Sequence, residues 1–107
     1  SLEIHTNASN NKTANGVECI ALPKDKVLAQ KLSAAVSKVT GSRLRGDKGY
    51  IGQEDSARGK LGYVSNGGLI LEVFFISNDS ELNTFEEKYW LIAKEVAQVL
   101  IDYVKSK

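Results

Sequence analysis

The feature of the sequence that most constrains its fold is a hydrophobic run, LILEVFFI, at residues 69–76, in which seven of the eight residues are apolar. The run is bounded by Gly67 and Gly68 on one side and by the polar stretch SNDS on the other. This pattern predicts a strand that is buried on both faces, as in the middle of a largely parallel sheet.

The run contains one charged residue, Glu72, near its centre. An ionised carboxylate is costly in an apolar setting, so the side chain is expected to be paired, neutralised or useful. Two interpretations follow from the residues alone: either Glu72 reaches solvent or a cation near the end of the strand, or it belongs to a functional site.

The rest of the chain predicts an α/β fold, a mostly parallel twisted sheet flanked by helices. Residues 1–6 alternate and residues 16–22 are mainly apolar, which predicts two strands. Helical spacing of apolar residues predicts a helix that begins after Asp25, a candidate cap, and ends at Gly41. A long loop over 42–60 and a short extended or helical piece over 61–64 follow. A short helix over 79–87, capped by Asn78 or Asp79, and a final amphipathic helix over 92–103 complete the prediction.

Composition bounds the class of protein. The 107 residues suffice for a single domain, 1–107, and the net charge of +1 does not favour a nucleic-acid partner. No stretch has the length and apolar character of a membrane span, so no membrane partner is expected. The single cysteine, Cys19, lies in an apolar run and is interpreted as a buried small hydrophobic residue rather than a nucleophile.

The only histidine, His5, lies in the first predicted strand, on the face opposite Leu2 and Ile4 and near the carboxyl end. Active sites of open α/β sheets lie at the carboxyl ends of strands, which makes His5 a candidate site residue. A lone histidine is nevertheless more often an ordinary surface or core side chain, so His5 alone does not identify a function.

Four stretches taken in order are more specific: EIHTNAS, GVECIAL, SRLRGDKG and LILEVFFISNDSEL, followed by a closing helix. This ordered set resembles the second half of the zinc-dependent N-acetylmuramoyl-L-alanine amidases, the family of bacterial cell-separation amidases and many phage endolysins. The resemblance covers nearly all of the chain. It implies hydrolysis of the amide bond between N-acetylmuramic acid and L-alanine in peptidoglycan.

The resemblance also implies roles for individual residues. His5 matches the last zinc-binding histidine of the family, and Glu72 matches its catalytic glutamate. Zinc would lower the pKa of a bound water, and a carboxylate would take the proton of that water during attack on the carbonyl. Asn7 and Arg45 match family positions and are candidate substrate-binding residues, with a turn residue and a solvated basic loop as the respective alternatives.

The sequence departs from the family in its metal ligands, because the family holds zinc with His, Glu and His, and the first two come from upstream of the strand that carries His5. Glu3 could approach a metal, although the family does not use that position. We therefore expect 1–107 to be the C-terminal part of an amidase catalytic domain, with the missing N-terminal half as its partner.

Two alternatives remain open: a non-catalytic remnant that binds peptidoglycan, and another metal hydrolase on the same scaffold. The resemblance implies action on the bacterial cell wall, by a protein that is secreted or periplasmic, or held in the host cytoplasm before lysis if it comes from a phage.

Overall fold

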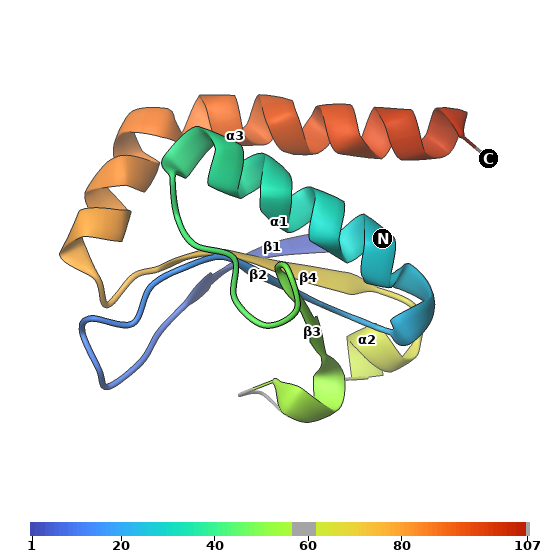
Figure 1. The fold of residues 1–107 in the computed structure, drawn as a ribbon, viewed down its shortest axis with the longest axis horizontal. Coiled ribbons are helices and arrows are strands. Elements are labelled where there is room, and N and C mark those ends of the chain that lie inside the picture. Colours follow the sequence, from blue (N-terminus) through green and yellow to red (C-terminus); the bar gives the residue numbers. More distant parts are fainter. Residues whose placement is uncertain (57–61, 107) are drawn as a thin grey trace.

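The computed structural model describes residues 1–56 and 62–106 of the chain. Its elements, in chain order (Figure 1), are strands β1 (Leu2–Asn7) and β2 (Glu18–Ala21), the 3-10 helix η1 (Pro23–Asp25), helix α1 (Lys26–Thr40), strand β3 (Tyr50–Gly52), the 3-10 helix η2 (Gln53–Asp55), helix α2 (Gly62–Ser65), strand β4 (Leu69–Phe75) and helix α3 (Asp79–Lys105).

The four strands form one sheet in the order β1-β4-β2-β3. Strand β1 pairs in parallel with β4, and β2 pairs in parallel with β3, whereas β2 and β4 are antiparallel. The sheet is therefore mostly parallel and confirms the predicted α/β class. The apolar run is an interior strand as predicted, since β4 lies between β1 and β2 and all seven of its residues are buried.

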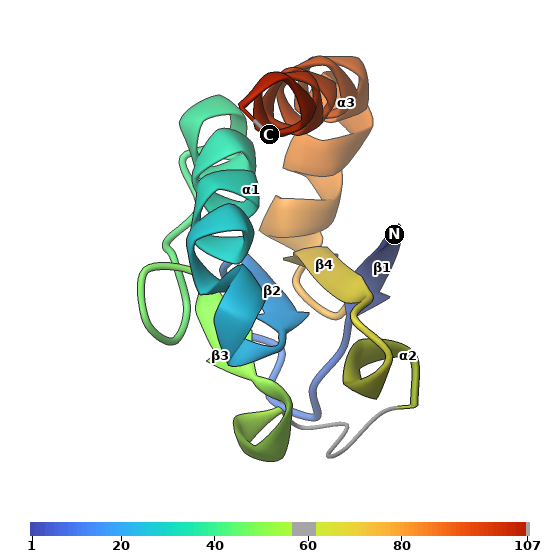
Figure 2. The same ribbon diagram turned by 90° about the vertical axis from the view of Figure 1, so that its right-hand side faces the viewer.

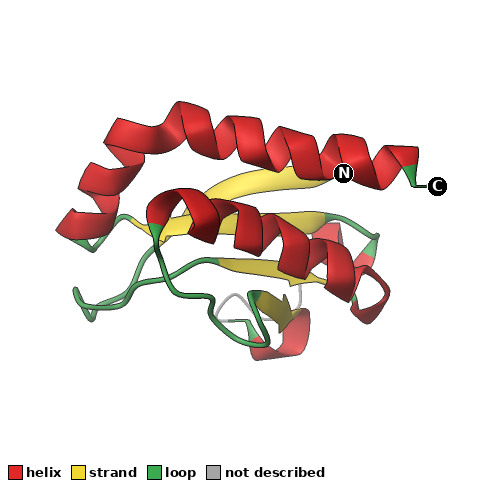
Figure 3. Ribbon diagram, turned by 45° about the horizontal axis from the view of Figure 1, so that its top comes forward, coloured by secondary structure: helices red, strands yellow, loops and turns green. Residues whose placement is uncertain are grey.

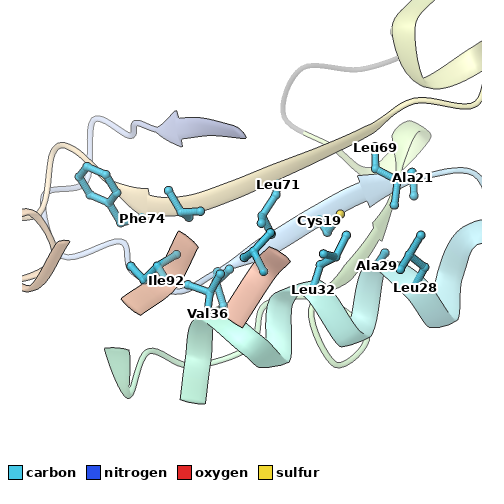
Figure 4. Packing of buried hydrophobic residues seen from close by; sticks show 13 residues of the cluster. Cys19, Ala21, Leu28, Ala29, Leu32, Val36, Leu69, Leu71, Phe74 and Ile92 are labelled. Atoms are coloured by element: carbon cyan, nitrogen blue, oxygen red, sulfur yellow. The ribbon is translucent and has the colours of Figure 1, made fainter. Parts of the chain in front are cut away.

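Helices α1 and α3 cover one face of the sheet, and the short helix α2 lies on the other (Figures 2 and 3). The main core fills the space between the sheet and the two long helices (Figure 4), with Cys19, Leu71, Leu32 and Val36 fully buried. A smaller cluster of Ile20, Ile70 and Val64 lies on the α2 face. Each full burial of a large aliphatic side chain contributes about 1.5–3 kcal/mol to folding.

The helix ends follow the sequence signals in two of three cases. Gly41 adopts a left-handed conformation, with φ of 74°, directly after α1. Asn78 caps α3, because its side-chain oxygen accepts a hydrogen bond from the Glu81 amide at 3.1 Å. Asp25 precedes α1 but makes no capping hydrogen bond, since its carboxylate instead accepts one from Lys24 at 2.9 Å.

The C-terminal region differs from its prediction, because the two expected helices are one helix, α3, of 27 residues. No glycine or proline interrupts residues 79–105, so nothing breaks the helical hydrogen bonding. The helix bends along its length instead, so that its first part descends towards β4 while its last part runs above α1 (Figure 1).

The predicted loop over 42–60 contains β3 and η2, which were not expected. Three residues are too few to show a strand periodicity, which explains why the sequence hides β3. Residues 57–61, which include part of this loop and the first residue of the predicted 61–64 piece, lie outside the described residues. Among the described residues, none of the helices combines the length and the hydropathy that crossing a bilayer requires.

Candidate active site

The two residues singled out by the sequence lie side by side in the sheet. His5 on β1 is the register partner of Glu72 on β4, and Glu72 in turn faces Glu18 on β2. Directly paired residues of neighbouring strands project their side chains to the same face. His5, Glu72 and Glu18 therefore form a row across three strands, on the face opposite α1 and α3. The row lies near the carboxyl end of β1, at the middle of β4 and at the first residue of β2.

The two inner members of the row are much more buried than the one at the sheet edge. The His5 side chain is 31% exposed, whereas Glu72 is 1% and Glu18 is 5% exposed. Two carboxylates thus lie next to each other in the interior of the sheet. Buried carboxylates require cations or hydrogen-bond donors around them, which makes their neighbours part of the site.

Arg45 supplies the positive charge beside Glu18. Its Nε donates a hydrogen bond to Glu18 Oε1 at 2.8 Å, and Nη1 donates to the Asn15 carbonyl at 3.0 Å. The guanidinium also lies over the ring of Phe75, 4.8 Å from the ring centroid, in a cation–π arrangement. Arg45 therefore connects β2, the loop after α1 and the end of β4.

An irregularity in β4 places Phe75 for this contact. His5 pairs with Glu72 but Asn7 pairs with Phe75, so two steps along β1 match three steps along β4. This extra residue is a β-bulge, a feature that often re-aims side chains beside active sites. Phe74 stacks on Phe85 of α3 with ring centroids 4.5 Å apart, while Phe75 contacts Arg45 on the site face.

At the edge of the sheet, His5 interacts with Glu3. The His5 Nε2 atom lies 2.8 Å from Glu3 Oε1, and both residues belong to β1. Within residues 1–56 and 62–106, no group of three His, Cys, Asp or Glu side chains is arranged to hold a metal ion. A catalytic zinc takes three protein ligands and a water, so His5 and its described neighbours do not form a complete zinc site.

The candidate substrate-binding residues have local partners. The Asn7 side-chain oxygen accepts a hydrogen bond from the Ala8 amide at 3.0 Å, which is a turn contact. Arg45 is directed inward to Glu18 rather than into solvent, although 28% of its side chain remains exposed. A role for either residue in binding substrate stays a prediction.

Glu81 fixes the end of β4 that carries the bulge. Its carboxylate accepts hydrogen bonds from the amide of Phe75 at 2.8 Å and from the amide of Gly16 at 2.7 Å. It also accepts one from the hydroxyl of Ser42 at 3.3 Å. One side chain at the start of α3 thus holds the end of β4, the entry to β2 and the segment after α1.

Cys19 lies in the core on the helix face, as its sequence context predicted. Burial, reinforced by the negative charges of Glu18 and Asp25, raises the pKa of the Cys19 thiol to about 12. The thiol is therefore protonated at neutral pH and does not act as a nucleophile. A surface groove of about 670 Å³ between α1 and α3 also lies on this helix side, away from Glu72.

Sequence reasoning missed Glu18 as a member of the site. The signal was present, because Glu18 interrupts the apolar stretch GVECIAL as Glu72 interrupts LILEVFFI. The two carboxylates lie in one row because β2 runs antiparallel to β4. A fully buried strand has the same apolar pattern whether it pairs in parallel or antiparallel, so the sequence does not show this direction.

Comparisons with known proteins identify the family of the chain. Residues 1–102 match the protein family described as N-acetylmuramoyl-L-alanine amidase. A structure assigned as an N-acetylmuramoyl-L-alanine amidase of Neisseria meningitidis has 39% sequence identity and a TM-score of 0.92; the match covers 98% of this chain and 58% of that one. A search of curated proteins found no match.

More distant structures share the fold. The catalytic domain of CwlV, an N-acetylmuramoyl-L-alanine amidase from Bacillus (Paenibacillus) polymyxa var. colistinus, has 22% identity and a TM-score of 0.74, with 99% of this chain and 57% of that chain covered. The catalytic domain of CD27L, an endolysin targeting Clostridia difficile, has 20% identity and a TM-score of 0.76, with 94% and 53% covered. The chain thus spans little more than half the length of these structures, and it belongs to the N-acetylmuramoyl-L-alanine amidase family.

Proposed function

We propose that the chain contributes to hydrolysis of the amide bond between N-acetylmuramic acid and L-alanine in peptidoglycan, with Glu72 as the general base. The observation that carries the proposal is the position of Glu72, which is buried at the middle of β4 directly beside His5, a residue near the carboxyl end of the parallel strand β1. Open α/β sheets place their active sites at the carboxyl ends of strands, close to which His5 lies in β1, and the chain is a family member by sequence.

The chemistry assigned to Glu72 is proton transfer. Its carboxylate takes a proton from the attacking water as the oxygen bonds to the lactyl carbonyl carbon. The carbon–nitrogen bond then breaks, and the same carboxyl group returns the proton to the departing nitrogen. The products are a lactyl carboxylate and a stem peptide with a free L-alanine amine. A rigid position in an interior strand keeps Glu72 in place for both transfers.

Zinc is part of the proposal, with His5 as one ligand. The described residues do not complete a zinc site, so the other ligands are assigned to the part of the domain that the relatives have and this chain does not span. Two further observations support an interaction of this chain with that part of the domain. Ile4 on edge strand β1 is 56% exposed, and α3 exposes Trp90 and Ile101 at 59% and 48%. Exposed apolar residues of this kind often mark an interaction surface.

The first experiment measures zinc and activity together. The 107-residue chain, and a chimera in which it replaces the matching part of the Neisseria meningitidis relative, are dialysed against metal-free buffer and analysed for zinc. Hydrolysis of purified peptidoglycan is followed by mass-spectrometric detection of new L-alanine amines. We expect activity and about one zinc per molecule in the chimera, because the zinc site is then complete.

The variant Glu72→Gln in the chimera is expected to lose hydrolysis by a factor on the order of 10² or more while zinc remains bound. Glu86→Gln, an exposed change on α3, serves as the matched control and should retain activity. Hydrolysis by Glu72→Gln at the parental rate would contradict the assignment of the base.

A second candidate function is binding of peptidoglycan without cleavage, which the lack of a three-ligand group among the described residues favours for this chain by itself. Sedimentation of the 107-residue chain with purified cell walls, with no released amine, would support it. Absence from the wall pellet would remove it.

A further inference from the structure

We propose that Glu18 and Arg45 form a positioning pair that holds the side chain of Glu72 in its working orientation. Neither residue is placed in contact with the reacting atoms; the pair acts through Glu72. The inference rests on the proposed role of Glu72, and it adds two residues and a test that does not depend on activity.

Glu18 and Glu72 bring two negative charges close together inside the sheet. Glu18 and Glu72 are register partners on antiparallel strands, and both are at least nine-tenths buried. Cβ atoms of such partners lie about 4.5–5.5 Å apart, so two bare carboxylates would repel each other at close range in a medium that screens poorly. The hydrogen-bonded guanidinium of Arg45 balances the charge of Glu18. Glu72 therefore has a charge-balanced neighbour on the β2 side.

Arg45 lies over Phe75, which belongs to the next row of the sheet beyond Glu72. Its Nε donates to Glu18 Oε1, so the same guanidinium contacts both the Glu18 carboxylate and the Phe75 ring. Glu72 is thus flanked by a fixed ion pair on β2 and by His5 on β1.

The surrounding chain is shaped to hold Arg45. Its amide donates to the Val17 carbonyl at 3.0 Å, and its carbonyl accepts from the Gly49 amide at 2.8 Å. Gly16, with φ of 109°, passes so close that a Cβ there would lie 2.8 Å from Arg45 Cγ. A side chain held by its own backbone contacts, by Asn15 and by Phe75 is preorganised, as residues that support a catalytic group need to be.

The test replaces the pair with neutral residues of similar shape, Glu18→Gln with Arg45→Met. Removing only Arg45 would leave a buried uncompensated charge and destabilise the fold, whereas neutralising both partners is far better tolerated. The matched control is Lys26→Met with Asp47→Asn, which removes an exposed ion pair of 2.7 Å between α1 and the same loop. If the double variant does not fold, Glu18→Gln alone takes its place, since glutamine still offers Arg45 an acceptor.

Two measurements decide the proposal. In the 107-residue chain, carbon-13 relaxation of the Glu72 side chain by NMR should show increased mobility in the pair variant and no change in the control. In the chimera, kcat should fall by about 10-fold to 100-fold with KM within about twofold, because misplacing a reacting group affects the chemical step.

Unchanged Glu72 relaxation in a folded pair variant would overturn the proposal, whatever the activity. An inactive parental chimera would instead count against the proposed function, while the NMR comparison would still decide whether the pair positions Glu72. A loss of kcat in the pair variant without a change at Glu72 would show that the effect arises elsewhere and would also overturn the proposal.

Discussion

Replacing Glu81 with alanine tests whether one carboxylate at the start of α3 holds the site strands together. Its two oxygens accept hydrogen bonds from the amides of Phe75 and Gly16, which both belong to buried residues. The substitution would leave both amides without their acceptor.

The expected cost follows from these contacts. Leaving a buried amide unsatisfied costs about 1–3 kcal/mol, so the loss of two predicts a decrease in unfolding free energy of roughly 2–6 kcal/mol. Glu81 is only half-buried, so water can replace part of the loss and the lower half of this range is expected. Glu81→Gln keeps one acceptor oxygen but turns an NH₂ group towards the other amide, so about half of the loss should remain.

Urea unfolding of the parental chain and the two variants measures these differences. Native-state hydrogen exchange adds a local readout, because the amides of Phe75 and Gly16 should exchange faster in the alanine variant while the core of α1 follows only the global change. Glu86→Ala, on an exposed turn of the same helix, is the matched control and should change stability by less than about 0.5 kcal/mol.

The reasoning would be refuted if Glu81→Ala unfolded at the same urea concentration as Glu86→Ala. It would also be refuted if exchange at Phe75 and Gly16 remained as slow as in the parental chain. Either result would mean that these amides do not depend on the Glu81 carboxylate.

Two further predictions concern the core and the loop. Because the folded pKa of Cys19, about 12, lies above its unfolded value, the stability from the neutral thiol is present below about pH 9 and is lost between about pH 9 and 12, at up to about 1.4 kcal/mol per pH unit. Cys19→Ala should flatten that part of the stability profile, and a slope as steep as the parental one would contradict the burial argument. Gly49→Ala should cost more than Gly41→Ala in urea unfolding, since both have positive φ but only the Gly49 Cβ would meet Ser33, at 2.3 Å. The left-handed conformation alone costs about 1–3 kcal/mol, so equal losses would show that the loop relaxes away from Ser33.

The sequence predicted the parts of the fold that depend on local patterns. The apolar run that became β4, the alternation in β1 and the helical spacing of α1 each correspond to an observed element. The prediction placed His5 near the carboxyl end of its strand, and β1 ends two residues later, at Asn7. These features could be predicted because side-chain periodicity, and glycine residues that end helices, are visible within a few residues of sequence.

What could not be predicted depends on contacts between distant segments. The antiparallel direction of β2, which aligns Glu18 with Glu72, has no local signature in a strand that is buried throughout. The bulge near the end of β4, beside which Phe74 packs on the helix face and Phe75 contacts Arg45 on the site face, depends on how β1 pairs with β4. The continuity of α3 was within reach, because residues 79–105 contain neither glycine nor proline that would separate a helix over 79–87 from one over 92–103.

Glu18 and Glu72 are both buried glutamates in apolar strands, but their surroundings differ. Glu18 has a cation at 2.8 Å and contacts that fix that cation in turn, so its burial is balanced within the described chain. Glu72 lies one strand further towards the open edge, beside a histidine that is partly exposed. A buried carboxylate with a purely structural role needs a counter-ion that remains bound to it. A carboxylate that transfers protons instead needs a neighbour that leaves room for substrate. From the position of each glutamate in the row, we propose the supporting role for Glu18 and the proton transfer for Glu72.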